Sequence, residues 1–131
     1  MNQRGFATLE IILMVMVIGI LASVAVPRFT AVTAKANTAK IQSDLSTLDT
    51  AISIYYMENG KYPDKISDLK DYVKDIDELK PPTGKAYVDG TETEITVTDY
   101  TLKEDTNTKE KRAALGDNFS GKFSVTKKKN S

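Results

Sequence analysis

The apolar residues of this chain are concentrated near its N-terminus. Between Glu10 and Arg28 lie seventeen consecutive residues without a charge. At about 1.5 Å per residue, a helix of this length covers roughly 25 Å, just short of a ~30 Å hydrocarbon core. Including Phe6–Leu9 makes the segment long enough to span a membrane, and the span then encloses Glu10. Arg4 precedes the span, which predicts a cytoplasmic N-terminus and a translocated remainder.

After this span the pattern becomes that of an amphipathic helix. Apolar residues recur at intervals of four and three, and so form one stripe on a helix: Ile41, Leu45, Leu48, Ile52 and Tyr55. Polar residues are expected on the opposite face: Lys35, Lys40, Ser43, Ser46, Asp49 and Thr50. Asn59-Gly60 predicts a left-handed C-cap after Glu58. A helix from Phe6 to Glu58 would be roughly 80 Å long, so its first half must lie in a bilayer or among other subunits.

The polar remainder predicts short elements that cover this stripe. A short helix is expected over about 67–78, capped by Ser67 or Asp68. Its apolar face would carry Leu69, Tyr72, Val73, Ile76 and Leu79. Asp89-Gly90 predicts a hairpin turn between strands 85–88 and 91–98, in a register that places Lys85 opposite Glu94.

The last third of the chain is expected to complete an antiparallel sheet over about 85–126. Residues 100–103 can add a strand, and residues 103–112 contain no apolar side chain and are typical of a solvated loop. Phe123 and Val125 alternate with polar neighbours, which predicts a last strand near 121–126. The expected fold class is therefore α+β, with a long N-terminal helix packed on a small antiparallel sheet.

Three interpretations of the N-terminal segment compete. A secretory signal peptide would use Arg4, an apolar region over 11–22, and a small-residue cleavage site at Ser23-Val24-Ala25. A plain membrane anchor is the second interpretation. Neither explains Glu10, because a charge deep in a membrane helix costs on the order of 2.5–3.5 kcal/mol and is functional by default. The third interpretation therefore assigns Glu10 a function.

The residues from Arg4 through Glu10, followed by an apolar run, resemble the class III signal of type IV pilins and the related pseudopilins. The resemblance implies that a prepilin peptidase cuts between Gly5 and Phe6 and N-methylates Phe6. It also implies that Glu10, the fifth residue of the cleaved chain, acts in assembly. The similarity continues to about Leu69, through Ser43-Asp44-Leu45, Ala51, Tyr55 and Asn59-Gly60-Lys61-Tyr62-Pro63.

The same resemblance divides the chain into three parts. Residues 1–5 would be a leader, residues 6–28 the membrane-spanning and filament-core half of the helix, and residues 29–131 a pilin-like globular domain. Gly19 and Pro27 match the positions that weaken the helix in this family, where proline removes a backbone hydrogen bond. We therefore expect the segment between these two residues to loosen when subunits pack.

The function implied is that of a filament subunit stored in the cytoplasmic membrane and then assembled into an extracellular or periplasmic filament. The implied partners are copies of itself, the prepilin peptidase, the assembly platform protein with its ATPase, minor pilins and the membrane. A type IV pilus, a type II secretion pseudopilus and a competence pseudopilus all fit. The alternative from a different class is a membrane-tethered binding domain that never polymerises.

Composition removes most catalytic chemistry. The chain has no cysteine and no histidine, so disulfides, thiolate sites and the commonest general base are excluded. The acidic residues occur singly, and no enzyme activity and no cofactor are expected. A structural calcium is the alternative, in a C-terminal domain whose acids lack a recognisable ligand spacing: Asp89, Glu92, Glu94, Asp99 and Asp117. The 18 basic and 18 acidic residues cancel, so no specific nucleic acid is expected.

Overall fold

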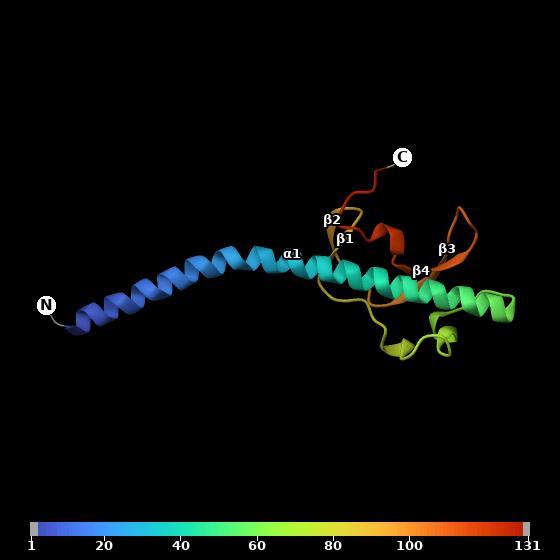
Figure 1. The fold of residues 1–131 in the computed structure, drawn as a ribbon, viewed down its shortest axis with the longest axis horizontal. Helices are drawn as coiled ribbons and strands as arrows, with labels where there is room; N and C mark the ends of the chain where they lie inside the picture. The colour runs from blue at the N-terminus through green and yellow to red at the C-terminus, as the bar shows by residue number, and fades with distance from the viewer. Residues whose placement is uncertain (1–2, 130–131) are drawn as a thin grey trace. The chain divides into compact units, whose positions relative to one another are not determined.

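The computed structural model describes residues 3–129, apart from the side chains at positions 25 and 27. The chain divides into two compact units, residues 1–32 (unit 1) and 33–131 (unit 2). One helix, α1, contributes to both units (Figure 1). The elements in chain order are α1 (Gln3–Asn59), the 3₁₀ helices η1 (Ile66–Leu69) and η2 (Ile76–Glu78), β1 (Lys85–Val88), β2 (Thr91–Glu94), β3 (Tyr100–Glu104), β4 (Lys111–Leu115), β5 (Asn118–Phe119) and η3 (Ser120–Lys122). The expected α+β class with a long N-terminal helix is confirmed.

The C-terminal end of α1 has the predicted geometry. The helix ends at Asn59, and Gly60 follows with φ of 70°. The Gly60 N–H donates to the Tyr56 carbonyl over 2.8 Å. Glycine adopts this left-handed conformation without the clash that a Cβ would cause, which is why the helix stops here.

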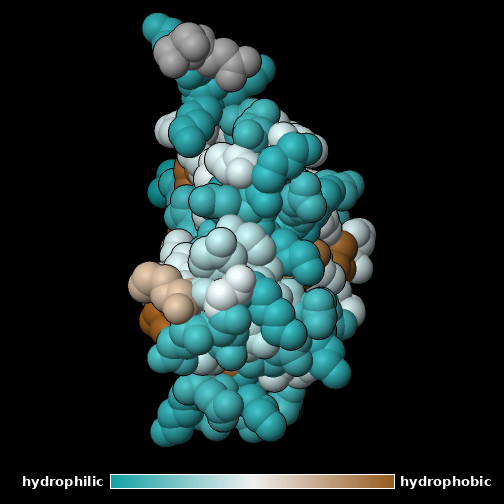
Figure 2. Space-filling view, turned by 90° about the vertical axis from the view of Figure 1, so that its right-hand side faces the viewer, coloured by the Kyte–Doolittle hydropathy of each residue, from teal (hydrophilic) through white to brown (hydrophobic). Residues whose placement is uncertain are grey.

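The core of unit 2 is built on the predicted apolar stripe. Ile41, Leu45, Leu48 and Ile52 are 0–2% exposed, and Tyr55 is partly buried. The cover comes from later segments through Leu69, Val73, Ile76, Ala86, Tyr100, Ala113, Leu115 and Phe123. Each large apolar side chain buried in this way contributes about 1.5–3 kcal/mol. The side of the molecule shown in Figure 2 is mainly hydrophilic with small, separated apolar patches.

Polar side chains of α1 tie the helix to the strands. Asn37 Nδ2 donates to the Thr83 and Lys85 carbonyls over 3.0 and 2.9 Å. The buried Thr38 Oγ1 accepts the Tyr87 N–H over 2.7 Å. These bonds give hydrogen-bond partners to the backbone groups at the edge of β1 that faces the helix. They stabilise the contact, because unpaired polar groups in a protein interior are costly.

The predicted helix over 67–78 is wrong. The structure has two short 3₁₀ helices, and Asp75 between them adopts a left-handed conformation with φ of 53°. An isolated helix of this length is marginal in water, so packing decides the local structure. Leu69, Val73 and Ile76 are buried as predicted, because the irregular backbone still turns them toward α1.

The hairpin at Asp89-Gly90 is confirmed. β1 and β2 pair with Lys85 opposite Glu94, and both turn residues have positive φ, as a two-residue hairpin turn requires. β2 ends at Glu94, earlier than predicted. The Ile95 N–H still reaches the Gly84 carbonyl over 2.7 Å. Pro81 and Pro82 lie on the N-terminal side of Thr83. They have no backbone N–H to donate, so the hydrogen-bond ladder with β2 cannot continue in that direction.

The strands form two antiparallel sheets, β1-β2 and β3-β4-β5, in place of a single one. β3 begins at Tyr100 as predicted. The expected loop over 103–112 is shorter, because Lys103 pairs with Arg112 and Glu104 with Lys111. The Asp105 N–H donates to the Glu110 carbonyl over 2.8 Å, which closes the turn and lets these polar strand ends pair.

The predicted strand over 121–126 is also wrong. This segment instead crosses the end of the first hairpin: the Asp89 and Gly90 N–H groups donate to the Lys122 and Ser124 carbonyls over 2.7 and 2.9 Å. A Cβ on Gly90 would lie 2.6 Å from the Lys127 nitrogen, so only glycine permits this approach. The hairpin turn therefore takes the hydrogen bonds that a further strand would have used.

Candidate functional site

The apolar side chains of unit 1 are exposed along its length. The large apolar residues between Phe6 and Val32 are 50–71% exposed. Within α1 lies an 18-residue window long and apolar enough to cross a membrane, and none of that window is buried by the chain. A helix that is apolar on all sides is stable only when lipid or protein surrounds it. Unit 1 is therefore the candidate functional segment.

The residues of the expected processing site lie on the first turns of α1. Arg4, Gly5, Phe6 and Glu10 are all exposed. The Thr8 hydroxyl donates to the Arg4 carbonyl over 2.9 Å, within the helix. A Cβ placed on Gly5 would meet no atom within 4 Å, so packing within this chain does not require a glycine there.

Glu10 carries a charge inside the apolar segment. Within residues 3–129, no basic side chain lies within ion-pair distance of its carboxylate. A carboxylate in a membrane is stable only with a partner, and such residues face a protein interior or a charged group. The described chain therefore leaves Glu10 available to a group from outside it.

The segment between Gly19 and Pro27 is helical in the backbone throughout. The Ser23 hydroxyl donates to the Ile20 carbonyl over 2.7 Å, and the Thr30 hydroxyl donates to the Val26 carbonyl over 3.1 Å. A Cβ on Gly19 would meet open space. The Pro27 side chain lies outside the described residues, and loosening of this segment stays a prediction.

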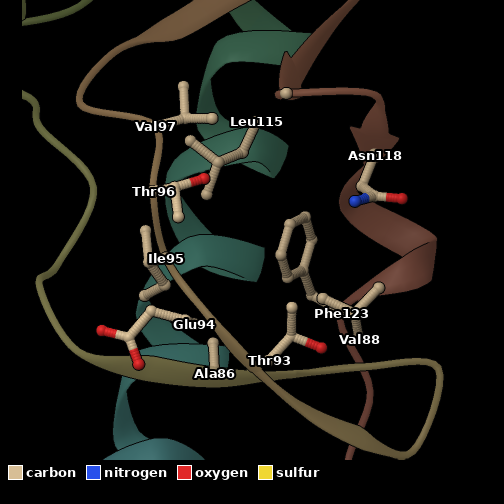
Figure 3. A pocket seen from close by; sticks show the side chains of 11 residues that line it. Ala86, Val88, Thr93, Glu94, Ile95, Thr96, Val97, Leu115, Asn118 and Phe123 are labelled. Atoms are coloured by element: carbon tan, nitrogen blue, oxygen red, sulfur yellow. The ribbon is translucent and has the colours of Figure 1, made fainter.

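Unit 2 has a small cavity between its two sheets (Figure 3). It encloses about 160 Å³, lined by Ala86, Val88, Thr93, Glu94, Ile95, Thr96, Val97, Leu115, Gly116, Asn118 and Phe123. Glu94 is the one titratable side chain in this lining. Acid–base catalysis needs a positioned pair of such groups, and this lining does not bring one together.

The five acids considered for calcium do not converge. Among residues 3–129, no group of three or more acidic side chains is placed to hold a metal ion. Asp99 pairs with Lys80 and Asp117 with Lys103, and these lysines lower the pKa of both carboxyls. The Asp89 carboxylate accepts the Lys128 N–H over 3.1 Å. Three of the candidates are thus occupied by donors of the chain itself.

The sequence pattern does not predict the polar contacts that join α1 to the sheet β3-β4-β5. Asp49, expected on the solvent face, is half-buried: its Oδ1 accepts the Ala113 N–H over 2.8 Å, and its Oδ2 lies 3.1 Å from Arg112 Nη2. Asp44 accepts the Tyr100 hydroxyl over 2.6 Å and pairs with Lys40 over 2.5 Å. One feature of the sequence indicates this burial: Asp49 directly follows Leu48 and therefore lies at the border of the buried stripe.

Relatives of known name match about half of the chain. The type II secretion system core protein G of Klebsiella michiganensis is 40% identical over 62 residues, which are 47% of this chain and 44% of the relative. The protein of the same name from Pectobacterium carotovorum is 38% identical over 69 residues, 53% and 44% of the two chains. The type IV major pilin protein PilA of Myxococcus xanthus is 32% identical over 68 residues, 52% and 31% of the two chains.

These matches define the relationship and its extent. The chain spans about half the length, or less, of the curated relatives it matches. No family model and no solved structure matches it. Over about half of its length, this chain is a homologue of the type II secretion pseudopilins and the type IV pilins.

Proposed function

We propose that this chain is the structural subunit of a type IV pilus-like filament. The observation that carries the proposal is the exposed apolar surface of residues 6–32, which includes the Glu10 carboxylate without an ion-pair partner among residues 3–129. Lipid covers this surface before assembly, and the helices of neighbouring copies cover it afterwards. The names of the relatives support the same class of protein. Unit 2 then forms the outer, hydrophilic part of the filament.

Processing is the first step of this function. The prepilin peptidase cuts between Gly5 and Phe6 and methylates the new N-terminus at Phe6. Because a Cβ on Gly5 meets open space, Gly5→Val changes recognition without a clash in the fold. The variant should remain full-length in the membrane, whereas the wild type yields a chain that starts at methylated Phe6.

Gly19→Val is the matched control, since Gly19 also faces open space on the same helix. Mass spectrometry should show that this variant is cleaved after Gly5. A native chain that starts at residue 26 would instead establish the secretory signal peptide and end the proposal.

Glu10 provides the docking charge. Cleavage leaves the Phe6 amine four residues before Glu10, the spacing of an ion pair within a helix. In a neighbouring copy the same amine offers an intermolecular partner, and weak screening in an apolar environment makes that attraction strong. Glu10→Ala should be cleaved and accumulate in the membrane at a near-normal level, yet build no filaments alone.

The assay compares the yield of sheared filaments with the yield of membrane-bound subunit. Glu10→Asp keeps the charge with one methylene less and should give fewer or shorter filaments. Normal filaments in a strain that carries only the Ala variant would contradict a docking role for Glu10.

The implied partners are the prepilin peptidase, the assembly platform protein with its ATPase, and minor pilins. A surface pilus and a secretion or competence pseudopilus use the same chemistry in the subunit. Electron microscopy of intact cells distinguishes them, because only a surface pilus gives long external fibres of this chain. A membrane-tethered binding domain would give processed subunit in the membrane and no fibre under any condition.

A further inference from the structure

The C-terminal segment of unit 2 carries an unbalanced positive charge. Residues 120–129 contain four lysines and no acid, and all four are exposed: Lys122, Lys127, Lys128 and Lys129. Within residues 3–129, none of them forms an ion pair. We call this set the basic face.

The basic face borders a hollow of about 560 Å³ whose charged lining residues are Lys122, Lys128, Arg112 and Asp89. The Arg112 charge is already balanced, because its guanidinium lies 3.1 Å from Asp49 and 3.6 Å from Asp105. The lysines at this hollow have no such partner. The Asp89 carboxylate accepts the backbone N–H of Lys128 over 3.1 Å, and the two lysine side chains leave the lining with a net positive charge that suits a segment with carboxylates.

The segment around η2 carries the opposite charge. Residues 71–78 contain four exposed acids and one lysine, for a net charge of −3. The acids are Asp71, Asp75, Asp77 and Glu78, and we call them the acidic face. None of them forms an ion pair with the described chain. Val73 and Ile76 between them are buried, so the backbone is held in place and little conformational freedom is lost on docking.

The two faces cannot neutralise each other within one copy. In unit 2, the C-terminal segment and the η1–η2 segment lie on opposite sides of α1 (Figure 1). Two basic or two acidic faces repel, so a two-fold contact of like surfaces is disfavoured. A contact of the basic face of one copy with the acidic face of the next leaves one face free at each end, and such heterologous contacts build open helical polymers.

We infer that the basic face of one copy binds the acidic face of a second copy. The inference rests on the proposed filament function and identifies the surfaces through which the outer domains meet. The contact lies between exposed charges, and salt therefore weakens it over a Debye length of about 8 Å.

Cysteine cross-linking tests the contact directly, because the chain has no cysteine of its own. Full-length Lys128→Cys and Asp77→Cys variants are co-expressed, and membrane and filament fractions are oxidised. We expect a covalent dimer in the mixture and not in either variant alone. The double variant Lys128→Cys/Asp77→Cys should give a ladder of dimers, trimers and longer products. Equal cross-linking in a single variant, or no cross-linking in the mixture, would overturn the inference.

Charge reversal tests whether the contact contributes to assembly. Lys122→Glu/Lys128→Glu should lower the yield of sheared filaments roughly tenfold, since two attractions become repulsions. Asp77→Lys/Glu78→Lys should lower it similarly, and the combination of all four changes should restore it. Lys35→Glu/Lys61→Glu reverses two exposed charges outside both faces and should leave the yield unchanged.

The outcomes separate the two proposals. A wild-type chain that builds no filament contradicts the filament function, and the cross-linking in the membrane fraction still decides the contact. If the lysine variants fail and the acidic variants assemble normally, the basic face serves an anionic partner other than a second copy, and the inference is wrong.

Discussion

The two halves of α1 contain similar apolar residues with opposite degrees of burial. Between residues 6 and 32 the large apolar side chains are at least half exposed, whereas Ile41, Leu45, Leu48 and Ile52 are 0–2% exposed. The difference lies in the pattern around the helix. In unit 2 the apolar residues occupy one stripe, and the chain supplies the segments that cover it. In unit 1 they occur on every side, and only lipid or other molecules can cover them.

Polar groups differ between the two units in the same way. Among the described residues, no buried side-chain nitrogen or oxygen lacks a hydrogen-bond partner. Unit 2 achieves this through residues of α1 such as Asn37, Thr38 and Asp49, which bond to the strands. Glu10 in unit 1 has no ion-pair partner in the described chain. Unit 2 therefore satisfies its buried polar side chains within the described chain, whereas the Glu10 carboxylate of unit 1 has no ion-pair partner there.

The largest expected effect comes from one substitution made in each half of α1. Leu48→Ala should destabilise unit 2 by about 2–5 kcal/mol, because it removes a fully buried side chain and leaves a cavity. Leu13→Ala, at a residue that is 53% exposed, should leave the unfolding of unit 2 unchanged. Thermal unfolding of the full chain in detergent, followed by circular dichroism, measures both. Equal effects would show that the two halves are not packed differently.

A smaller effect is expected from the polar contacts of unit 2. Asp49→Asn should cost about 1.5–3 kcal/mol, because the half-buried carboxylate bonds both the Ala113 N–H and the Arg112 guanidinium. Asp117→Asn breaks an exposed pair with Lys103 and should leave the denaturation midpoint unchanged. Urea unfolding of the full chain in detergent compares the two. If Asp117→Asn lowered the free energy of unfolding as much as Asp49→Asn, burial would not determine how strongly these ion pairs stabilise unit 2.

The features predicted well from the sequence are those with a local cause. The stripe from Ile41 to Ile52 follows from the helical period, and the turn at Asp89-Gly90 follows from the left-handed preference of those residues. The apolar residues 69, 73 and 76 were also predicted to be buried, although the helix around them was not formed. Burial there depends on hydrophobicity, whereas the helix depends on length and packing.

The features predicted badly depend on distant partners. The segment 121–126 alternates like a strand, but the N–H groups of Asp89 and Gly90 bind two of its carbonyls, Lys122 and Ser124. The helical pattern predicts that Asp49 faces solvent, but Arg112, far along the chain, holds it at the border of the core. The roles proposed for Gly5 and Glu10 depend on molecules outside the chain. A pattern in one sequence identifies such residues only through resemblance to a family.

The smallest expected effect concerns the response of unit 2 to alkaline pH. Tyr100 is 5% exposed, and burial together with its hydrogen bond to Asp44 raises the pKa of its phenol above the ordinary value of 10.0. The folded protein therefore keeps this proton where the unfolded chain loses it. Stability from this group is complete below pH 10 and falls above it, by up to about 1.4 kcal/mol per pH unit.

Tyr100→Phe loses the bond to Asp44 and should be less stable at neutral pH. The stability of this variant should also fall less steeply above pH 10, because phenylalanine has no proton to lose. The lysines and the other tyrosines are the same in both proteins, so the difference in slope comes from Tyr100. Urea unfolding of both proteins in detergent at several pH values should give curves that converge as the pH rises. Parallel curves would mean that Tyr100 ionises equally in both states.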